Sequence, residues 1–137
     1  MALLTTKGIY GIQAILEIVN ASEISPISIK EISQRSKISR GYLEQILNSL
    51  RNANIISSIK GKSGGYYLSK SLDEITFYEL FSTLEKDLDM TNIEIKNSAL
   101  NLYFKQCNDK IKELLSTPLS EISKFESQST KYLNFVI

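Results

Sequence analysis

The chain has 137 residues, with 16 Lys and Arg against 15 Asp and Glu, a single cysteine and no histidine. This length allows one domain, or one small domain with an appended helix, and a net charge of +1 gives no overall field to attract a polyanion. One cysteine cannot build a disulfide framework, and the lack of histidine removes the commonest general base and metal ligand, so we do not expect an enzyme.

The first predicted helix covers residues 6 to about 21. Its N-terminal threonines can cap it, and apolar residues recur at helical spacing at Ile9, Ile12, Leu16 and Val19. Lys7, Gln13 and Glu17 interrupt the apolar run, which is too short for a membrane span and lacks the form of a targeting segment. We therefore expect a cytoplasmic protein without a membrane partner.

Two further helices are predicted with a short connection between them. Ser28, with Glu31 three residues later, forms a capping box for a helix that ends near residue 36. Ser39 caps the next helix, which extends to about residue 52. This helix has an apolar inner face, Leu43, Ile46, Leu47 and Leu50, and a polar outer face, Arg40, Glu44, Asn48 and Arg51. The pair fits a helix-turn-helix.

A glycine-rich hairpin follows the third helix. The segments "IISSIK" at 55–60 and "YYLS" at 66–69 read as strands, and the "GKSGG" between them supplies the conformations of a short turn. Three helices and then a hairpin is the winged-helix order. Residues 1–75 also carry nine Lys and Arg against six Asp and Glu, whereas residues 76–137 carry seven against nine. A polyanion is therefore expected to bind residues 1–75.

The back half is predicted to be helical. Thr76 with Glu79 opens a fourth helix whose apolar residues are Phe77, Leu80, Phe81 and Leu84. Thr91 with Glu94 opens a long helix to about residue 116, and Thr117 and Pro118 start a short last helix. The segment after about residue 126 gives no assignment.

The long helix carries two apolar stripes. The first consists of Ile93, Leu100, Phe104, Cys107, Ile111 and Leu114, with Asn97 at a core-type position. The second consists of Ile95, Ala99, Leu102 and Leu115. One stripe can pack on its own domain, and the other would remain exposed in a monomer, which favours a homodimer. The alternative is that both are buried within one chain.

The fold class expected from these elements is mainly α with a small β-hairpin, that is, an α+β winged helix-turn-helix with a long C-terminal dimerisation helix. We expect residues 1–75 to form the DNA-binding region and residues 76–137 a helical dimerisation region, packed together as one compact unit.

Three segments carry a resemblance to a known family: "LTTKGIYGIQAI", "ISRGYLEQILNSLRNANIISSIKGKSGGYYLSK" and "TPLSEI". From about residue 4 to residue 122, the chain resembles the IscR/NsrR/CymR family of bacterial winged-helix regulators. The resemblance implies a homodimer, formed by the long helix, that binds a pseudo-palindromic operator in double-stranded DNA. It implies control of transcription, which we expect to be repression.

The start of the third helix holds the expected base contacts. Arg40 could donate to guanine or to a phosphate, Gln45 could pair with adenine, and Glu44 could accept from cytosine. Ser39 and Tyr42 could bind phosphates, although Ser39 could equally be only a cap and Tyr42 only an aromatic at the core edge. Gly41 stands where relatives often have a short polar residue. The alternative for Arg40, Glu44 and Gln45 is a solvated face.

The hairpin tip is expected to meet the DNA backbone or the minor groove. Lys60, Lys62 and Ser63 would present cations and a hydroxyl, and the glycines would let the backbone come close, namely Gly61, Gly64 and Gly65. Lys7 and Tyr10 are secondary candidates for phosphate contact. A winged-helix module that binds protein instead of DNA is the alternative function, but the charged third helix lacks aromatic anchors.

This chain also differs from the cluster-binding members of the family that it resembles. Cluster-binding relatives have three cysteines before the long helix, whereas "EKDLDMTNIEIKNSA" has none. We therefore expect no metal and no cofactor, as in the cluster-free branch similar to the cysteine-metabolism regulators. A regulatory protein or a small-molecule effector would supply the signal. Cys107 is expected to be a buried structural residue and not a sensor.

Overall fold

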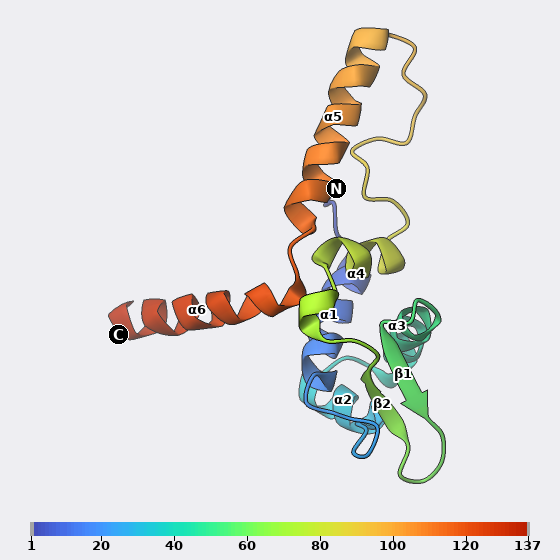
Figure 1. Ribbon diagram of the computed structural model, residues 1–137, viewed down its shortest axis with the longest axis vertical. Coiled ribbons are helices and arrows are strands. Elements are labelled where there is room, and N and C mark those ends of the chain that lie inside the picture. The colour runs from blue at the N-terminus through green and yellow to red at the C-terminus, as the bar shows by residue number, and fades with distance from the viewer. Residues whose placement is uncertain (1, 137) are drawn as a thin grey trace.

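The computed structural model describes residues 2–136. A body of four helices and a two-stranded hairpin carries two projecting helices, as Figure 1 shows. The elements are α1 (Thr6–Ile18), α2 (Ile29–Ser36), α3 (Arg40–Asn52), β1 (Ile56–Ile59), β2 (Gly65–Leu68), α4 (Phe77–Leu84), α5 (Ser98–Leu115) and α6 (Ile122–Val136), with 3₁₀ turns at Leu72–Glu74 and Leu119–Glu121. This confirms the mainly α winged helix-turn-helix fold. Among the described helices, none combines the length and apolar character that a membrane crossing needs.

The inward face of α1 differs from the sequence expectation. Ala14, Ile15 and Ile18 are fully buried, whereas Ile9 is 43% exposed and Ile12, Leu16 and Val19 are only partly covered. The buried face also includes Gly8 and Gly11, which a search for apolar side chains overlooks. A Cβ at Gly11 would lie 2.0 Å from Cδ1 of Leu84, so the glycines let α4 pack closely against α1.

A carboxylate at the end of α4 binds the N-terminal end of α1. The Glu85 side chain accepts hydrogen bonds from the backbone N–H groups of Thr5 (2.7 Å) and Gly8 (3.2 Å), and also from the Thr5 hydroxyl at 3.0 Å. A carboxylate at this end of a helix is favoured by the helix dipole. Helix α1 is therefore fixed to α4 at its first turn.

The helix-turn-helix forms as the sequence predicts. Ser28 accepts from the N–H of Glu31, and Ser39 accepts from the N–H of Tyr42, so each serine caps its helix. Lys37 turns the chain between the helices with a left-handed φ of 65°. The inner face of α3 is fully buried, as predicted, at Leu43, Ile46, Leu47 and Leu50.

The hairpin is attached to the body by a third, one-residue strand. β1 and β2 pair in antiparallel fashion, from Ile56 opposite Leu68 to Ile59 opposite Gly65. Ile27 then pairs with Tyr66 on the other side of β2 through two backbone hydrogen bonds of 3.0 and 2.8 Å. The segment before α2 therefore holds the hairpin beside the helix-turn-helix.

Helix α5 begins six residues later than a cap at Thr91 predicts. Asn97 is its N-cap, because the Asn97 Oδ1 accepts from the N–H groups of Ala99 (3.0 Å) and Leu100 (3.1 Å). Asn97 is therefore not at a core position, and Ile93 lies in the preceding loop, 72% exposed. An Asn side chain that can bond backbone N–H groups locally outweighed the Thr91 capping pattern.

The two C-terminal helices extend away from the body. Figure 1 shows α5 rising beside the loop of residues 85–97, with α6 pointing sideways. Between them Leu119, 1% exposed, anchors the chain in the core, and its N–H donates to the carbonyl of Ile75 at 2.7 Å. The predicted short last helix is instead the 15-residue α6, which includes the segment after residue 126 that the sequence left unassigned.

Candidate nucleic-acid interface

The first turns of α3 present polar side chains to solvent. Arg40, Glu44 and Gln45 are all exposed, on the face opposite the buried leucines. Ser39 is also exposed, and its hydroxyl accepts from the Tyr42 N–H at 3.3 Å. The structure thus gives Ser39 a capping role, which leaves its hydroxyl hydrogen available for another acceptor.

Tyr42 lies at the edge of the core. Its ring is half-buried and meets the ring of Tyr10 edge to face, with the ring centroids 5.6 Å apart. Tyr10 and Tyr42 therefore join α1 to α3, and neither ring is a plain surface side chain. Lys7, the other secondary candidate, lies in the first turn of α1 and is half-buried.

The hairpin tip is cationic and exposed. Lys60, Lys62 and Ser63 all lie in the loop between β1 and β2. Gly61 has a φ of +114°, a conformation that side chains rarely adopt. In the described part of the chain, neither Lys60 nor Lys62 forms an ion pair.

The other two glycines of the hairpin have a reason inside the fold. A Cβ at Gly64 would lie 2.1 Å from the carbonyl oxygen of Ile59, and a Cβ at Gly65 would lie 2.3 Å from that of Ile27. The sequence had suggested that Gly64 and Gly65 spare room for DNA. The structure adds a reason inside the fold for each glycine, the approach to Ile59 in the hairpin tip for Gly64 and the approach to Ile27 for Gly65, and their contact with DNA stays a prediction.

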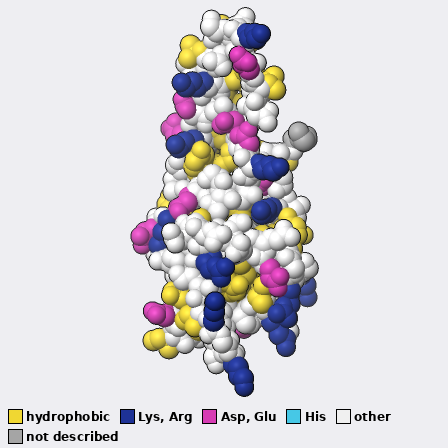
Figure 2. Space-filling view, turned by 90° about the vertical axis from the view of Figure 1, so that its right-hand side faces the viewer, with side chains coloured by type: hydrophobic (Ala, Val, Ile, Leu, Met, Phe, Trp, Pro, Cys, Tyr) yellow, Lys and Arg dark blue, Asp and Glu magenta, His cyan; other side chains and the backbone are white. Residues whose placement is uncertain are grey.

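A surface hollow lies between helix α3 and the hairpin. It has a volume of about 350 Å³ and is lined by Glu44, Gln45, Asn48 and Arg51 of α3 and by Tyr66 of β2. In Figure 2, Lys and Arg side chains gather at the lower end of the molecule, where Figure 1 places the hairpin. The polar face of α3 and the cationic tip therefore lie on one end of the body.

Three residues of this surface were not predicted from the sequence to be part of the site. Asn48 and Arg51 were assigned only to the outer face of α3, yet the Arg51 guanidinium donates to Asn48 Oδ1 and to the Ser58 hydroxyl on β1. Their spacing of three residues was the available signal. Tyr66 lies opposite Ser58 in the hairpin and also pairs with Ile27, and the second pairing could not be predicted from a local pattern.

Comparison with known proteins places the whole chain in one family. Residues 4–133 match the Rrf2 family, described as iron-dependent transcriptional regulators. The chain belongs to the Rrf2 family of transcriptional regulators. It is 31% identical to the HTH-type transcriptional regulator CymR of Bacillus subtilis over 136 residues, which are 97% of this chain and 99% of CymR. It is 38% identical over 93 residues to IscR of Escherichia coli, which covers 68% of this chain but only 57% of IscR.

Solved structures agree with this assignment. The structure of CymR, described as the global cysteine regulator of B. subtilis, superposes with a TM-score of 0.76 at 32% identity, covering 91% of this chain and 98% of CymR. The structure of T. potens IscR gives a TM-score of 0.73 at 28% identity, covering 92% and 89% of the two chains. The Rrf2 chain is therefore a DNA-binding regulator of the helix-turn-helix type and not an enzyme.

Helix α5 of this Rrf2 protein leaves its predicted stripe largely uncovered. Leu100 is 52% exposed and Leu114 is 72% exposed, while Phe104, Cys107 and Ile111 are partly covered. Cys107 is thus not buried within one chain. A hydrogen bond with Cys107 raises the pKa of the exposed Tyr103 hydroxyl above its usual range.

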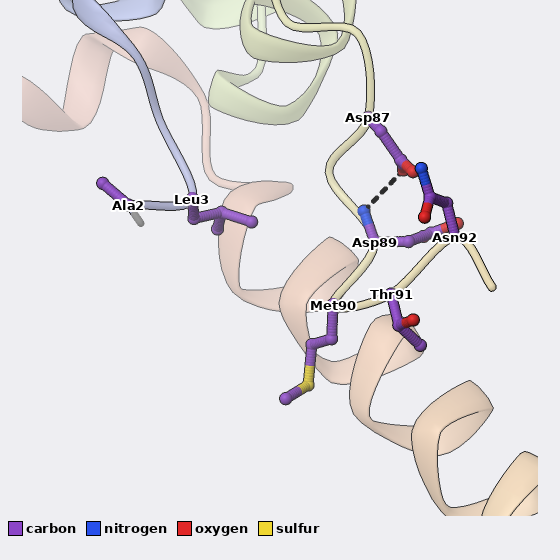
Figure 3. A pocket seen from close by; sticks show the side chains of 7 residues that line it. All are labelled: Ala2, Leu3, Asp87, Asp89, Met90, Thr91 and Asn92. Carbon is purple, nitrogen blue, oxygen red and sulfur yellow. Dashed lines mark hydrogen bonds between the residues drawn. The ribbon is translucent and has the colours of Figure 1, made fainter.

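The loop before α5 is the segment whose lack of cysteine led us to expect no cluster. Beside it lies a hollow of about 410 Å³, lined by Ala2, Leu3, Asp87, Asp89, Met90, Thr91 and Asn92. Figure 3 shows the Asp89 N–H bonded to the Asp87 carboxylate and Met90 pointing away from Asp87. None of the side chains that line this hollow carries a thiol.

The iron of the family description does not fit these residues. An iron–sulfur cluster is held chiefly by thiolates, with histidine as the usual substitute. This chain has one cysteine and no histidine, so even two chains together supply only two thiolates. Within residues 2–136, no three His, Cys, Asp or Glu side chains gather in a way that could hold a metal ion.

Proposed function

We propose that this regulator acts as a homodimer on a pseudo-palindromic operator, with α3 in the major groove and the hairpin as a wing on the backbone or minor groove. The observation that carries this proposal is that the polar face of α3 lies at the same end of the body as Lys60 and Lys62, which form no ion pair among the described residues. When the operator overlaps a promoter, the bound dimer represses transcription.

Base readout is assigned to the exposed residues of α3. Arg40 donates to guanine or to a phosphate, Gln45 pairs with adenine, and Glu44 accepts from cytosine. Their support is exposure at the N-terminal end of a helix whose opposite face is fully buried. Ser39 and Tyr42 are assigned to phosphate contact in addition to their roles as cap and packing residue.

Dimerisation is assigned to the apolar stripe of α5. Helix α5 has no buried residue within its own chain, and α6 exposes Phe125 (60%) and Leu133 (55%). Apolar surface left uncovered on two projecting helices supports a second copy as the occupant. In this proposal residues 1–75 remain the DNA-binding region and residues 76–137 the dimerisation region, although α4 packs into the body with α1 and α3.

The wing assignment predicts a change in salt dependence. Replacing Lys60 and Lys62 by Ala removes two cations per protomer, and each lost phosphate contact flattens the slope of log K against log salt by about 0.9. We expect a shallower slope with little change in sequence preference, measured by fluorescence anisotropy with labelled duplexes. Arg40→Ala is the contrasting variant, because it should weaken preferred sites more than random DNA. An unchanged slope in the double variant would refute the wing assignment.

The cluster-free assignment predicts a colourless protein. We propose that the chain lies in the same branch as the CymR relatives and takes its signal from a small molecule or a regulatory protein. Prepared without oxygen, it should contain no iron by elemental analysis and should show no visible absorption. Its DNA affinity should not respond to chelators, and Cys107→Ser should leave its response to peroxide unaltered. Stoichiometric iron with visible absorption would contradict this assignment.

A further inference from the structure

Arg51 occupies the junction between the third helix and the hairpin. It lies in the last turn of α3, where its Nη2 donates to Asn48 Oδ1 at 2.9 Å and its Nη1 donates to the Ser58 hydroxyl at 3.3 Å. One acceptor belongs to the helix and the other belongs to β1. The guanidinium is therefore held at a defined place between the two elements that the proposed function assigns to DNA.

Two surface hollows meet at this side chain. Arg51 and Tyr66 line the hollow along α3, and both also line a second one of about 320 Å³ beneath the hairpin. The second hollow includes Ser58, Lys60 and the hairpin glycines. A ligand that runs from the α3 face to the hairpin tip therefore passes Arg51.

The acceptors of Arg51 leave its charge intact. Both are neutral groups, an amide oxygen and a hydroxyl, and among residues 2–136 no carboxylate pairs with it. Arg35 on α2 is the internal contrast, because it donates to the Glu31 carboxylate at 2.6 Å. Two hydrogen bonds also leave several of the five guanidinium N–H groups for another acceptor. The arrangement orients a cation without neutralising it.

We propose that Arg51 is a prearranged phosphate-binding residue that takes a DNA backbone phosphate between the groove contacts of α3 and the wing. This inference rests on the proposed function. The planar guanidinium can bind a phosphate with two parallel hydrogen bonds, which a lysine ammonium cannot. Asn48 and Ser58 reduce the cost of binding, because they fix the side chain before the phosphate arrives.

The test compares five variants by anisotropy on a duplex of mixed sequence over a series of salt concentrations: Arg51→Ala, Arg51→Lys, Ser58→Ala, Asn48→Ala combined with Ser58→Ala, and Arg35→Ala. Arg51→Ala should lower affinity about tenfold, as expected for a lost hydrogen bond to a charged group, and should flatten the slope by about 0.9 per protomer. The Arg51→Lys variant should show the wild-type slope of log K against log salt, with part of the DNA affinity lost. Asn48→Ala with Ser58→Ala should also keep the slope, since the charge remains, and should lose affinity severalfold.

Arg35→Ala is the matched control, because it removes an exposed arginine whose charge is already paired. It should leave both slope and affinity unchanged. The Arg51 proposal is overturned if Arg51→Ala behaves like wild type, or if Ser58→Ala alone reproduces its loss of slope, since the hydrogen bond would then only position the wing. A wild-type protein that binds duplex without salt dependence would instead refute the proposed function, so the two failures are distinct.

Discussion

Leu100→Asp should convert the protein to a monomer and abolish operator binding. Leu100 is 52% exposed within one chain, so the carboxylate stays hydrated in the monomer and the fold of the protomer is preserved. In a dimer formed through the α5 stripe, the same carboxylate would be buried without a partner, which costs several kcal/mol. Light scattering should give the mass of one chain, and circular dichroism should remain that of the wild type.

The DNA result follows from the geometry of two half-sites. Recognition helices about 34 Å apart can engage one face of a duplex only when both protomers are joined. Asn101→Asp is the control, because residue 101 is exposed and lies roughly 100° around α5 from this stripe, on the side away from Ala99 and Leu102. It should leave both dimer and DNA binding intact. A wild-type chain that is monomeric at micromolar concentration would contradict the dimer proposal, as would an unaltered dimer in Leu100→Asp.

Gly65→Ala should strongly destabilise the protein. The added Cβ would lie 2.3 Å from the carbonyl oxygen and 2.5 Å from the carbonyl carbon of Ile27, and these backbone atoms cannot rotate away. The clash separates β2 from Ile27, which is 5% exposed and precedes the cap of α2. We expect a loss of about 3 kcal/mol in the free energy of unfolding, or roughly 10 °C in melting temperature.

The glycine-to-alanine substitution at Gly41 should instead increase the stability of the protein. A Cβ at Gly41 meets nothing within 4 Å, and its backbone is helical. Alanine costs less chain entropy in a helix than glycine, so Gly41→Ala should stabilise the protein by about 0.5 kcal/mol. Urea unfolding monitored by circular dichroism compares the two variants. If Gly65→Ala unfolds at the wild-type midpoint, the assigned role of the Ile27 pairing is wrong.

Local signals were enough for the elements that the sequence predicted well. Ser28, Ser39 and Thr76 each cap the helix expected of them, because a hydroxyl three residues before a backbone N–H acts within a single turn. The buried face of α3 also followed directly from its helical spacing. These features depend on neighbours in sequence, so no tertiary information was required.

Most features that the sequence could not predict depend on contacts between distant segments. The buried face of α1 is set by Gly8 and Gly11 against α4, and glycine has no apolar side chain to reveal it. The roles of Gly64 and Gly65 depend on carbonyls of residues 59 and 27, and the link from Arg51 to Ser58 depends on the hairpin folding back on α3. The start of α5 was misplaced for a different, local reason, because two possible N-caps, Thr91 and Asn97, lie close together in sequence.

Selection of bound duplexes from a randomised pool, followed by sequencing, tests the central claim most directly. A homodimer that reads bases through α3 should enrich an inverted repeat whose half-sites lie about one helical turn apart, or a multiple of it. Repeating the selection with Arg40→Ala should lose the preference at matching positions of both half-sites. Enrichment of no sequence, or of a single half-site without its inverted copy, would contradict the account.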